Sequence, residues 1–403
     1  MNALKFAIGA YYLAPYASTP EHVKDLAECG IDVVVNMRND RAALDLLQQR
    51  GVRAIVSGIV PGWFGGDGSN AGSMSEKNPL YRYEEAAARF EDHPAIVGID
   101  AGDEPSSEDF AHYGRVIDTI QTRFPDKTAY LNIYPSYAVK GSNTPQEIAR
   151  QLGADSYGEY ISRYVSQVHT PYICFDYSLY SADLPGLYES LTTVSQACRQ
   201  HGRSMWMVLQ VNSHRPEVFV SERQLWFQGS CALAFGARRI IWACYCAGWW
   251  YNHVLDRQGC KTEQYDKLRR VNAGLHRLGE NCMRYRHADT SFIGSFTQEE
   301  LRGARLEPLT TLSTDCFHGL HADGAKLLAG RMIPRDGSAG EALFLAAADD
   351  PQGLEIREHR VWFESHCTIR VIGKDGDVTV ERHENGLYSV KLETCQGILL
   401  TAQ

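Results

Sequence analysis

Short apolar runs alternate with amphipathic segments through the first 285 residues of the chain. The runs that predict strands are 6–15, 31–38, 52–60, 95–105, 128–135, 172–180, 204–212 and 238–246. Helical periodicity follows each run, at 19–30, 40–51, 81–93, 107–124, 157–168, 185–202, 221–236 and 262–280. Eight strands that each precede a helix predict an α/β fold, the (β/α)8 or TIM barrel. A doubly wound open sheet is the alternative, but no GxGxxG motif follows the first run.

The pattern changes at about residue 286. From there to residue 403, short alternating segments such as EALFLAAADD, CTIRVIG and YSVKLETCQGILLTA are separated by turn sequences such as KDGD and ENG. This texture predicts a small antiparallel β-sandwich domain over 286–403, packed on a catalytic barrel over 1–285. We expect the second domain to be structural.

Composition narrows the class of partner. The 403 residues carry a formal net charge of −9 and no Lys/Arg-rich block, which argues against nucleic acid or an anionic membrane as a partner. No apolar run reaches transmembrane length, and the amino terminus lacks the pattern of a signal peptide. The 11 cysteines have no regular spacing, so we expect a cytoplasmic protein with no metal site and no cofactor. The sequence leaves open whether the protein forms a homo-oligomer.

Two adjacent carboxylates, Asp103 and Glu104, follow the fourth predicted strand. Pro105 ends that strand, and Ser106 or Ser107 offers an N-cap for the next helix. Capping needs only a serine, so the carboxylates are better explained as site residues. The carboxyl ends of barrel strands are where such folds carry their chemistry.

The other strand ends carry amides, flat rings and one further carboxylate, Asp176. Such groups suit a neutral polyhydroxylated ligand, because rings stack on C–H faces and amides bond to hydroxyls. Arg38 is the one cation at these ends, which is too little for a phosphate ligand. For any single ring, packing between barrel and helices is the alternative explanation. The predicted carbohydrate-binding residues are Tyr12, Arg38, Trp63, Asn132, Tyr134, Tyr177, Gln210, Asn212, Trp242 and Tyr245.

This combination predicts glycoside hydrolysis, which needs a carboxylic acid to protonate the leaving oxygen and a second group to stabilise the sugar cation. Glu104 is the candidate general acid/base, and a neighbouring Asp103 carboxylate would help to keep it protonated. Asp176 lies within an apolar run. It is either a second catalytic carboxylate or half of a structural ion pair, for example with Arg38.

The GDEP sequence that ends strand four resembles the acid/base segment of the clan A retaining glycoside hydrolases, which carry Asn-Glu-Pro there. It also resembles the Asp-Glu pair of glycoside hydrolase families 20 and 123, barrel enzymes that act on β-N-acetylhexosaminides. The second resemblance implies that Asp103 orients the substrate's acetamido group and that Glu104 is the acid/base. Clan A places its nucleophilic Glu at the end of strand seven, where this chain has Gln210.

Two mechanisms are therefore open. One is substrate-assisted hydrolysis of a 2-acetamido sugar, and the other uses Asp176 as nucleophile or base. We expect an exo-acting enzyme on oligosaccharides or glycoconjugates. A non-catalytic carbohydrate-binding protein on a hydrolase scaffold is the competing hypothesis, prompted by Gln210.

Overall fold

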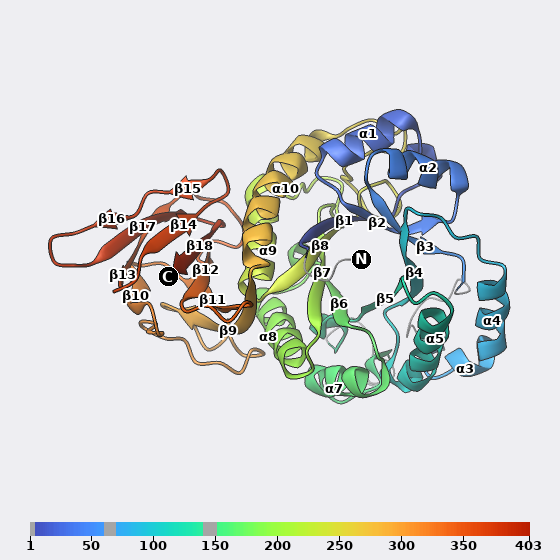
Figure 1. Ribbon diagram of the computed structural model, residues 1–403, viewed down its shortest axis with the longest axis horizontal. Coiled ribbons are helices and arrows are strands. Elements are labelled where there is room, and N and C mark those ends of the chain that lie inside the picture. The colour runs from blue at the N-terminus through green and yellow to red at the C-terminus, as the bar shows by residue number, and fades with distance from the viewer. Residues whose placement is uncertain (1–4, 60–69, 140–150) are drawn as a thin grey trace.

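The computed structural model describes residues 5–59, 70–139 and 151–403, and the amino-terminal part is a closed barrel of eight parallel strands (Figure 1). The strands pair in sequence order, and β1 closes the ring against β8. This confirms the predicted (β/α)8 fold. The barrel strands are β1 (Ala7–Tyr11), β2 (Val33–Arg38), β3 (Arg53–Ser57), β4 (Ile96–Asp103), β5 (Thr128–Ile133), β6 (Tyr172–Tyr177), β7 (Ser204–Gln210) and β8 (Ala237–Ala243).

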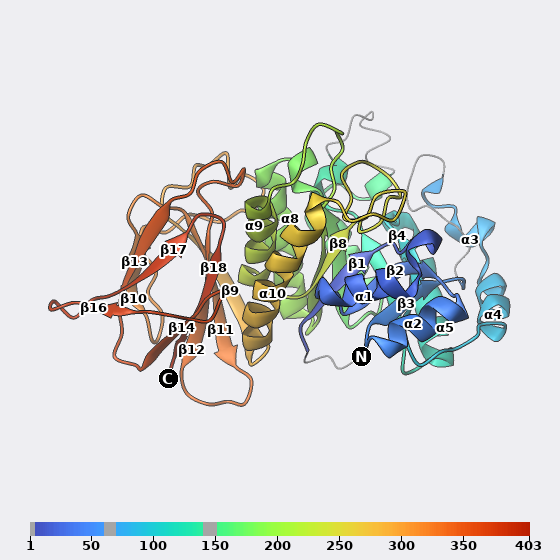
Figure 2. The same ribbon diagram turned by 90° about the horizontal axis from the view of Figure 1, so that it is seen from above.

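Helices surround the barrel, and their first turns follow the capping signals of the sequence (Figures 1 and 2). Thr19 accepts a hydrogen bond from the His22 amide at the start of α1, and Ser221 forms a capping box with Gln224 at the start of α9. No described helix is long and apolar enough to cross a membrane. The helices are α1 (Pro20–Glu28), α2 (Arg41–Gln49), α3 (Met74–Lys77), α4 (Leu80–Ala88), α5 (Phe110–Arg123), α7 (Tyr157–Gln167), α8 (Leu184–Gln200), α9 (Glu222–Ala234) and α10 (Glu263–Cys282).

Large side chains fill the interior of the barrel. The rings of Tyr172 and Trp206 stack with centroids 3.8 Å apart, and Tyr130 lies parallel to them. The Arg239 guanidinium covers the Trp206 ring at 3.9 Å, a cation–π contact in the deepest part of the interior. This packing fills the barrel interior, and barrels of this kind bind their ligands at the carboxyl ends of the strands.

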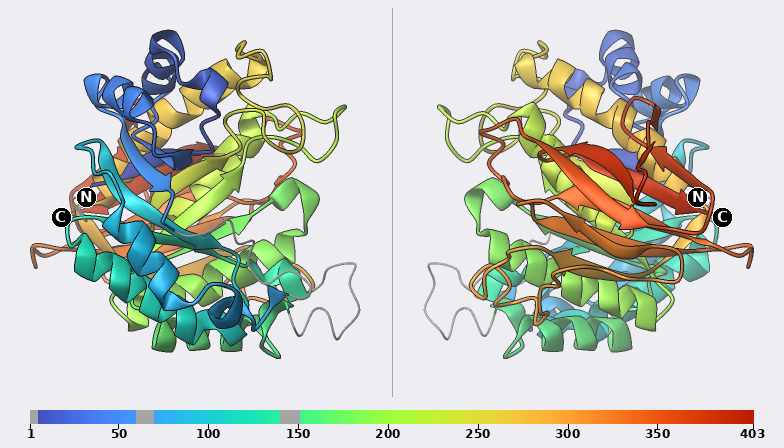
Figure 3. Two further views of the ribbon diagram at one scale, coloured as in Figure 1. Left: turned by 90° about the vertical axis from the view of Figure 1, so that its right-hand side faces the viewer. Right: turned by 90° about the vertical axis from the view of Figure 1, so that its left-hand side faces the viewer.

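The carboxyl-terminal region is a sandwich of two antiparallel sheets, as predicted (Figure 3, right). One sheet has the order β10-β13-β17-β16 and the other β15-β14-β18-β12-β11-β9. Apolar residues of both sheets share one core, which includes Leu343 and Val361. The strands are β9 (Tyr285–Ile293), β10 (His318–Ala322), β11 (Leu327–Pro334), β12 (Glu341–Ala347), β13 (Glu358–Glu364), β14 (Ile369–Ile372), β15 (Asp377–Val378), β16 (Glu381–Arg382), β17 (Tyr388–Glu393) and β18 (Gly397–Ala402).

The six-stranded sheet also packs against the barrel, on the side of α9 and α10 (Figure 2). Its strands alternate, so that Leu343 and Leu345 of β12 face the sandwich core while Phe344 joins the barrel core. At Gly330 of β11 the backbone meets the Ala234 carbonyl so closely that a Cβ would collide with it. The two parts therefore share a tightly packed, apolar junction.

Candidate active site

A cavity of about 730 Å³ opens at the carboxyl ends of the barrel strands. Volumes of this size are typical of small-ligand sites. Polar groups from β4, β5 and β6 and from the segment after β5 line one side of it: Asp103, Glu104, Asn132, Tyr137 and Asp176. The predicted strand-four carboxylates and Asp176 thus lie in one cavity.

The backbone at the end of β4 turns sharply and holds Glu104 in place. Glu104 has a φ of 43°, in the left-handed region that only a few non-glycine residues adopt, and its amide donates to the Asn132 carbonyl at 2.9 Å. Gly102, with a φ of 139°, packs so that an added Cβ would lie 2.8 Å from the Tyr113 ring. Ser106 alone caps the 3-10 turn Ser107–Asp109 that follows, so neither carboxylate is used for capping.

A single amide connects two of the three carboxyl groups. Asn132 Nδ2 donates to Asp103 Oδ1 at 3.0 Å and to Asp176 Oδ1 at 2.9 Å. The Tyr11 hydroxyl donates to the other oxygen of Asp103 at 3.3 Å, and the Tyr137 hydroxyl donates to Asp176 Oδ2 at 3.0 Å. These hydrogen bonds hold both aspartates in fixed orientations around the cavity.

Asp176 and Glu104 form a pair that shares a proton. Burial raises the pKa of Asp176, while hydrogen bonds from Asn132, Tyr137 and Glu104 act in the opposite direction. A hydrogen bond between two carboxyl groups requires one proton, so the two groups together hold a single proton. The cavity thus presents a protonated carboxyl group beside an ionised one.

A third aspartate, Asp100, lies deeper in the barrel. Burial raises the pKa of Asp100 to about 7, against a hydrogen bond from the Gly102 amide at 3.0 Å. The neighbouring charge of Asp103 raises it further. Asp100 is not among the groups that line the cavity, so its effect on the site is electrostatic.

Aromatic rings flank the cavity on the side of β8. Trp249 lies in the lining, is 40% exposed and meets the rings of Tyr11 and Tyr12 at centroid distances of 5.9 and 5.7 Å. Trp250 packs against His214 at 3.8 Å, and both of these also line the cavity. Flat, partly exposed rings at a cavity suit stacking against a sugar.

Some of the predicted carbohydrate-binding residues line the cavity, some lie near it, and the others are absent from its lining or fall outside the described residues. Asn132 and Gln210 line the cavity, but the Gln210 amide is engaged with backbone, accepting from Tyr180 N at 2.9 Å and donating to the Asn212 carbonyl at 3.0 Å. Tyr12 packs on Trp249 beside the cavity, and Arg38 is exposed at the end of β2. No ion pair joins Arg38 to Asp176 or to any other described residue. Trp63 lies outside the described residues.

The remaining predicted side chains do not line the cavity. Tyr177 donates to the Asp183 carbonyl at 2.6 Å, and the Trp242 indole donates to Asn272 of α10 at 2.8 Å. Successive strand residues face opposite sides, so Asp176 and Ala243 point inward while their neighbours point to the helices. The predicted side chains that are absent from the cavity lining are Tyr134, Tyr177, Asn212, Trp242 and Tyr245.

Tyr137 is a site residue that the sequence did not indicate. It lies in the 3-10 turn Ser136–Val139 after β5, and its only signal was an aromatic residue close to a strand end.

Within residues 5–59, 70–139 and 151–403, no three His, Cys, Asp or Glu side chains are arranged to hold a metal ion. The polar side chains that line the cavity include carboxyl groups, amides and hydroxyls.

No family model and no curated protein sequence matches this chain. Solved structures do resemble it. A cycloisomaltooligosaccharide glucanotransferase from Paenibacillus, in complex with cycloisomaltoheptaose, aligns over 99% of this chain and 85% of its own, with 8% identity and a TM-score of 0.53. At this identity the likeness shows the fold alone, and it extends over the barrel and the sandwich together.

Other structures align with about two thirds of the chain. A candidate alpha-L-fucosidase from Bacteroides thetaiotaomicron covers 66% of this chain and 96% of its own, with 11% identity and a TM-score of 0.49. Xylanase 10B from Thermotoga maritima covers 67% and 95%, with 10% identity and a TM-score of 0.42.

Proposed function

We propose that this protein is a glycoside hydrolase with Glu104 as its general acid/base. The observation that carries the proposal is the hydrogen-bonded pair of Glu104 and Asp176, which gives one protonated and one ionised carboxyl group in the same cavity. Hydrolysis of a glycosidic bond needs these two groups, one to protonate the leaving oxygen and one to stabilise or attack the sugar cation.

The contact between the two carboxyl groups supports a retaining mechanism. An inverting pair stands about 6.5–9.5 Å apart to admit a water molecule, and a retaining pair about 5–5.5 Å apart, so two carboxyl groups in hydrogen-bond contact lie nearer to the retaining separation. In this scheme Glu104 protonates the leaving group, Asp176 attacks the anomeric carbon, and Glu104 then deprotonates the water that releases the sugar. Asn132 and Tyr137 hold the Asp176 carboxylate in position for that attack.

Substrate-assisted hydrolysis of a 2-acetamido sugar is the second route through the same acid. Here the substrate's acetamido oxygen would replace Asp176 as nucleophile, and Asp103 would orient it. Asp103 is suited to this because it lines the cavity and is already held by Asn132 and Tyr11. The partly exposed ring of Trp249 supports stacking against a sugar, and a cavity at the barrel mouth supports exo-acting cleavage of a chain end.

A non-catalytic sugar-binding protein is the competing function. The observation in its favour is Gln210, which stands at the clan A nucleophile position, is 2% exposed and uses its amide to bond backbone groups. Calorimetric binding of a sugar, without turnover on any glycoside, would favour this alternative.

The test is release of nitrophenol from a panel of nitrophenyl glycosides that includes 2-acetamido sugars. We expect Glu104→Gln to lower kcat/KM by about 10²–10⁴-fold on the best substrate, because it removes the general acid. Glu108→Gln, at an exposed glutamate four residues away, is the matched control and should retain activity. Full activity of Glu104→Gln would refute the assignment.

The same panel separates the two routes. If Asp176 is the nucleophile, Asp176→Asn abolishes turnover of every substrate and added azide restores a glycosyl product. If the substrate supplies the nucleophile, 2-acetamido sugars react far faster than unsubstituted ones and a thiazoline analogue inhibits. Equal rates on both sugar types would eliminate the substrate-assisted route.

A further inference from the structure

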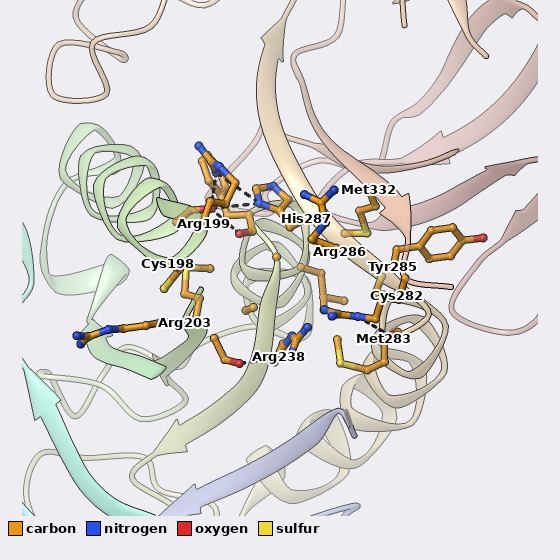
Figure 4. Close-up of a pocket in the computed structure, with 18 of the residues that line it drawn as sticks. Cys198, Arg199, Arg203, Arg238, Cys282, Met283, Tyr285, Arg286, His287 and Met332 are labelled. Atoms are coloured by element: carbon orange, nitrogen blue, oxygen red, sulfur yellow. Dashed lines mark hydrogen bonds between the residues drawn. The ribbon is translucent and has the colours of Figure 1, made fainter. Parts of the chain in front are cut away.

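A second cavity, of about 230 Å³, lies at the opposite end of the barrel, where the β-sandwich is attached (Figure 4). Ser204 and Arg238 line it from the starts of β7 and β8, and Arg286 and His287 line it from β9. Glu104 follows the carboxyl end of β4, so the packed interior of the barrel separates this cavity from the candidate active site. Residues of both domains thus meet around it.

Arginine dominates the lining of this second cavity. No Asp or Glu is among the described residues that line it, although the chain as a whole carries a net charge of −9. Asp289 is an acidic neighbour of Arg199, but it also faces Arg331 at 3.8 Å. The arginines come from α8, the α8–β7 connection, β8, β9 and the segment after β11: Arg199, Arg203, Arg238, Arg286 and Arg335.

Two of these arginines donate some of their hydrogen bonds to backbone carbonyls at the carboxyl ends of helices. Arg203 donates to the Val165 and Val168 carbonyls at 2.7 and 2.9 Å, and it extends away from the others in Figure 4. Arg335 donates from Nε to the Met283 carbonyl at 3.2 Å. A helix end carries only about half a negative charge. Such contacts therefore do not neutralise the charges of Arg203 and Arg335.

Hydrogen-bond donors also remain. The Arg286 side chain makes no hydrogen bond or ion pair with any residue in the described ranges, and it is exposed. Arg199 uses one nitrogen, Nη1, for Ser195 Oγ at 3.0 Å and lies 3.5 Å from His287 Nδ1. Burial, with the nearby Arg199 charge, lowers the pKa of His287 to about 3, so its ring is neutral. Arg335, like Arg286, is exposed.

We propose that this cavity binds a small doubly charged oxyanion of the phosphate class, free or as a phosphomonoester, which bridges the barrel and the sandwich. Guanidinium groups bind such oxyanions through paired, charge-assisted hydrogen bonds. Arg199 and Arg238 belong to the barrel part of the chain, and Arg286 and Arg335 belong to the sandwich. A cavity of about 230 Å³ suits one phosphoryl group rather than a polymer chain. The bound anion would offset the mutual repulsion of arginines across the junction.

Thermal unfolding and calorimetry of the full chain test this proposal. Inorganic phosphate, and phenyl phosphate as a monoester, should raise the unfolding midpoint relative to chloride at equal ionic strength, and both should bind with measurable heat. Arg286→Gln/Arg335→Gln should weaken binding at least tenfold. The control Arg50→Gln, at an exposed arginine after α2, should bind as the parent does. Tighter binding of the ester than of free phosphate would identify an esterified ligand.

Two results would overturn the proposal. One is the absence of both binding heat and a midpoint shift with either phosphate compound. The other is binding to the double variant that equals binding to the parent, which would place the anion elsewhere. If the double variant does not fold, the single variant Arg286→Gln at the exposed position serves the same comparison. The result does not depend on the glycosidase assay, because Glu104 lies at the other end of the barrel.

Discussion

Asn132 donates to Asp176 across 2.9 Å, and this bond joins β5 to β6 at the mouth of the barrel. The same nitrogen bonds to Asp103 of β4, so a single amide aligns carboxyl groups from the strands on either side of it. An uncharged donor between two acids holds them close without adding a charge of its own. The proposed chemistry depends on this arrangement.

Tyr137→Phe should shift the pH dependence of activity. The Tyr137 hydroxyl bonds to Asp176 and stabilises its ionised form, so its removal raises the pKa of Asp176. Catalysis by ionised Asp176 is then lost at a higher pH, and the acid limb of the kcat/KM profile moves upward. The control is Tyr188→Phe, because the buried Tyr188 hydroxyl has no hydrogen-bond partner among the described residues. An unmoved acid limb would contradict the role given to Asp176.

Trp249→Ala should weaken substrate binding more than it slows the chemistry. The ring lines the cavity and is 40% exposed, so it is available for stacking. A ring contact of about 0.5–1.5 kcal/mol corresponds to a rise in KM of about twofold to twelvefold with little change in kcat. Tyr251→Ala removes another exposed ring from the same loop, outside the cavity, and should leave KM unchanged. Equal KM values for both variants would exclude a stacking role.

Asp100→Asn should change how stability depends on pH. The pKa of Asp100 is raised to about 7 by burial, so between about pH 4 and 7 the folded state binds a proton that the unfolded state releases. The stability of the parent therefore falls as pH rises through this window, by about 4 kcal/mol at most from this group. The variant lacks this loss and should be more stable than the parent at pH 8.

The measurement is urea denaturation at pH 5 and pH 8. The amide oxygen that Asp100→Asn introduces can still accept the hydrogen bond from the Gly102 amide that Asp100 accepts in the parent. The control Asp375→Asn, at an exposed turn, should keep the pH dependence of the parent. Identical slopes for the Asp100 variant and the parent would show that Asp100 does not carry the effect.

Gly330→Ala should destabilise the junction between barrel and sandwich. An added Cβ would collide with the Ala234 carbonyl at the end of α9, and overpacking of this kind costs about 1–3 kcal/mol. The urea midpoint should fall accordingly. Gly158→Ala in α7, where a Cβ meets open space, should leave stability unchanged or raise it. If Gly330→Ala leaves the urea midpoint unchanged, the backbone at the junction moves to accommodate the added Cβ.

The sequence predicted the elements well because each signal is local. Eight apolar runs became β1 to β8, and the helix expected over 107–124 is a 3-10 turn at Ser107–Asp109 followed by α5 to Arg123. Ser106 caps that turn, as one of the two serines was expected to do. Asp103, Glu104 and Asp176 could be proposed from the sequence because carboxylates at the ends of apolar strands are conspicuous, and the three residues line one cavity.

Whether an individual strand side chain points into or out of the barrel was harder to predict. Period-two alternation allows either Asp176 or Tyr177 to face the cavity, and both were proposed; the structure turns Tyr177 outward. Asp100 and Asp103 are three residues apart and would face opposite sides of a regular strand. A bulge in β4 between Asp100 and Gly102 shifts the register and brings both to the interior.

By itself, the sequence determined the order of strands and helices, the place where strand four stops and the presence of adjacent acids there, because these follow from hydrophobic period, proline and capping within a few residues. Only the tertiary structure decided that Tyr137 and Asp176 meet Glu104, and that arginines from distant parts of the chain surround one cavity. Those neighbours arise from barrel closure, strand register and domain packing. Such long-range relations leave no local pattern in the chain.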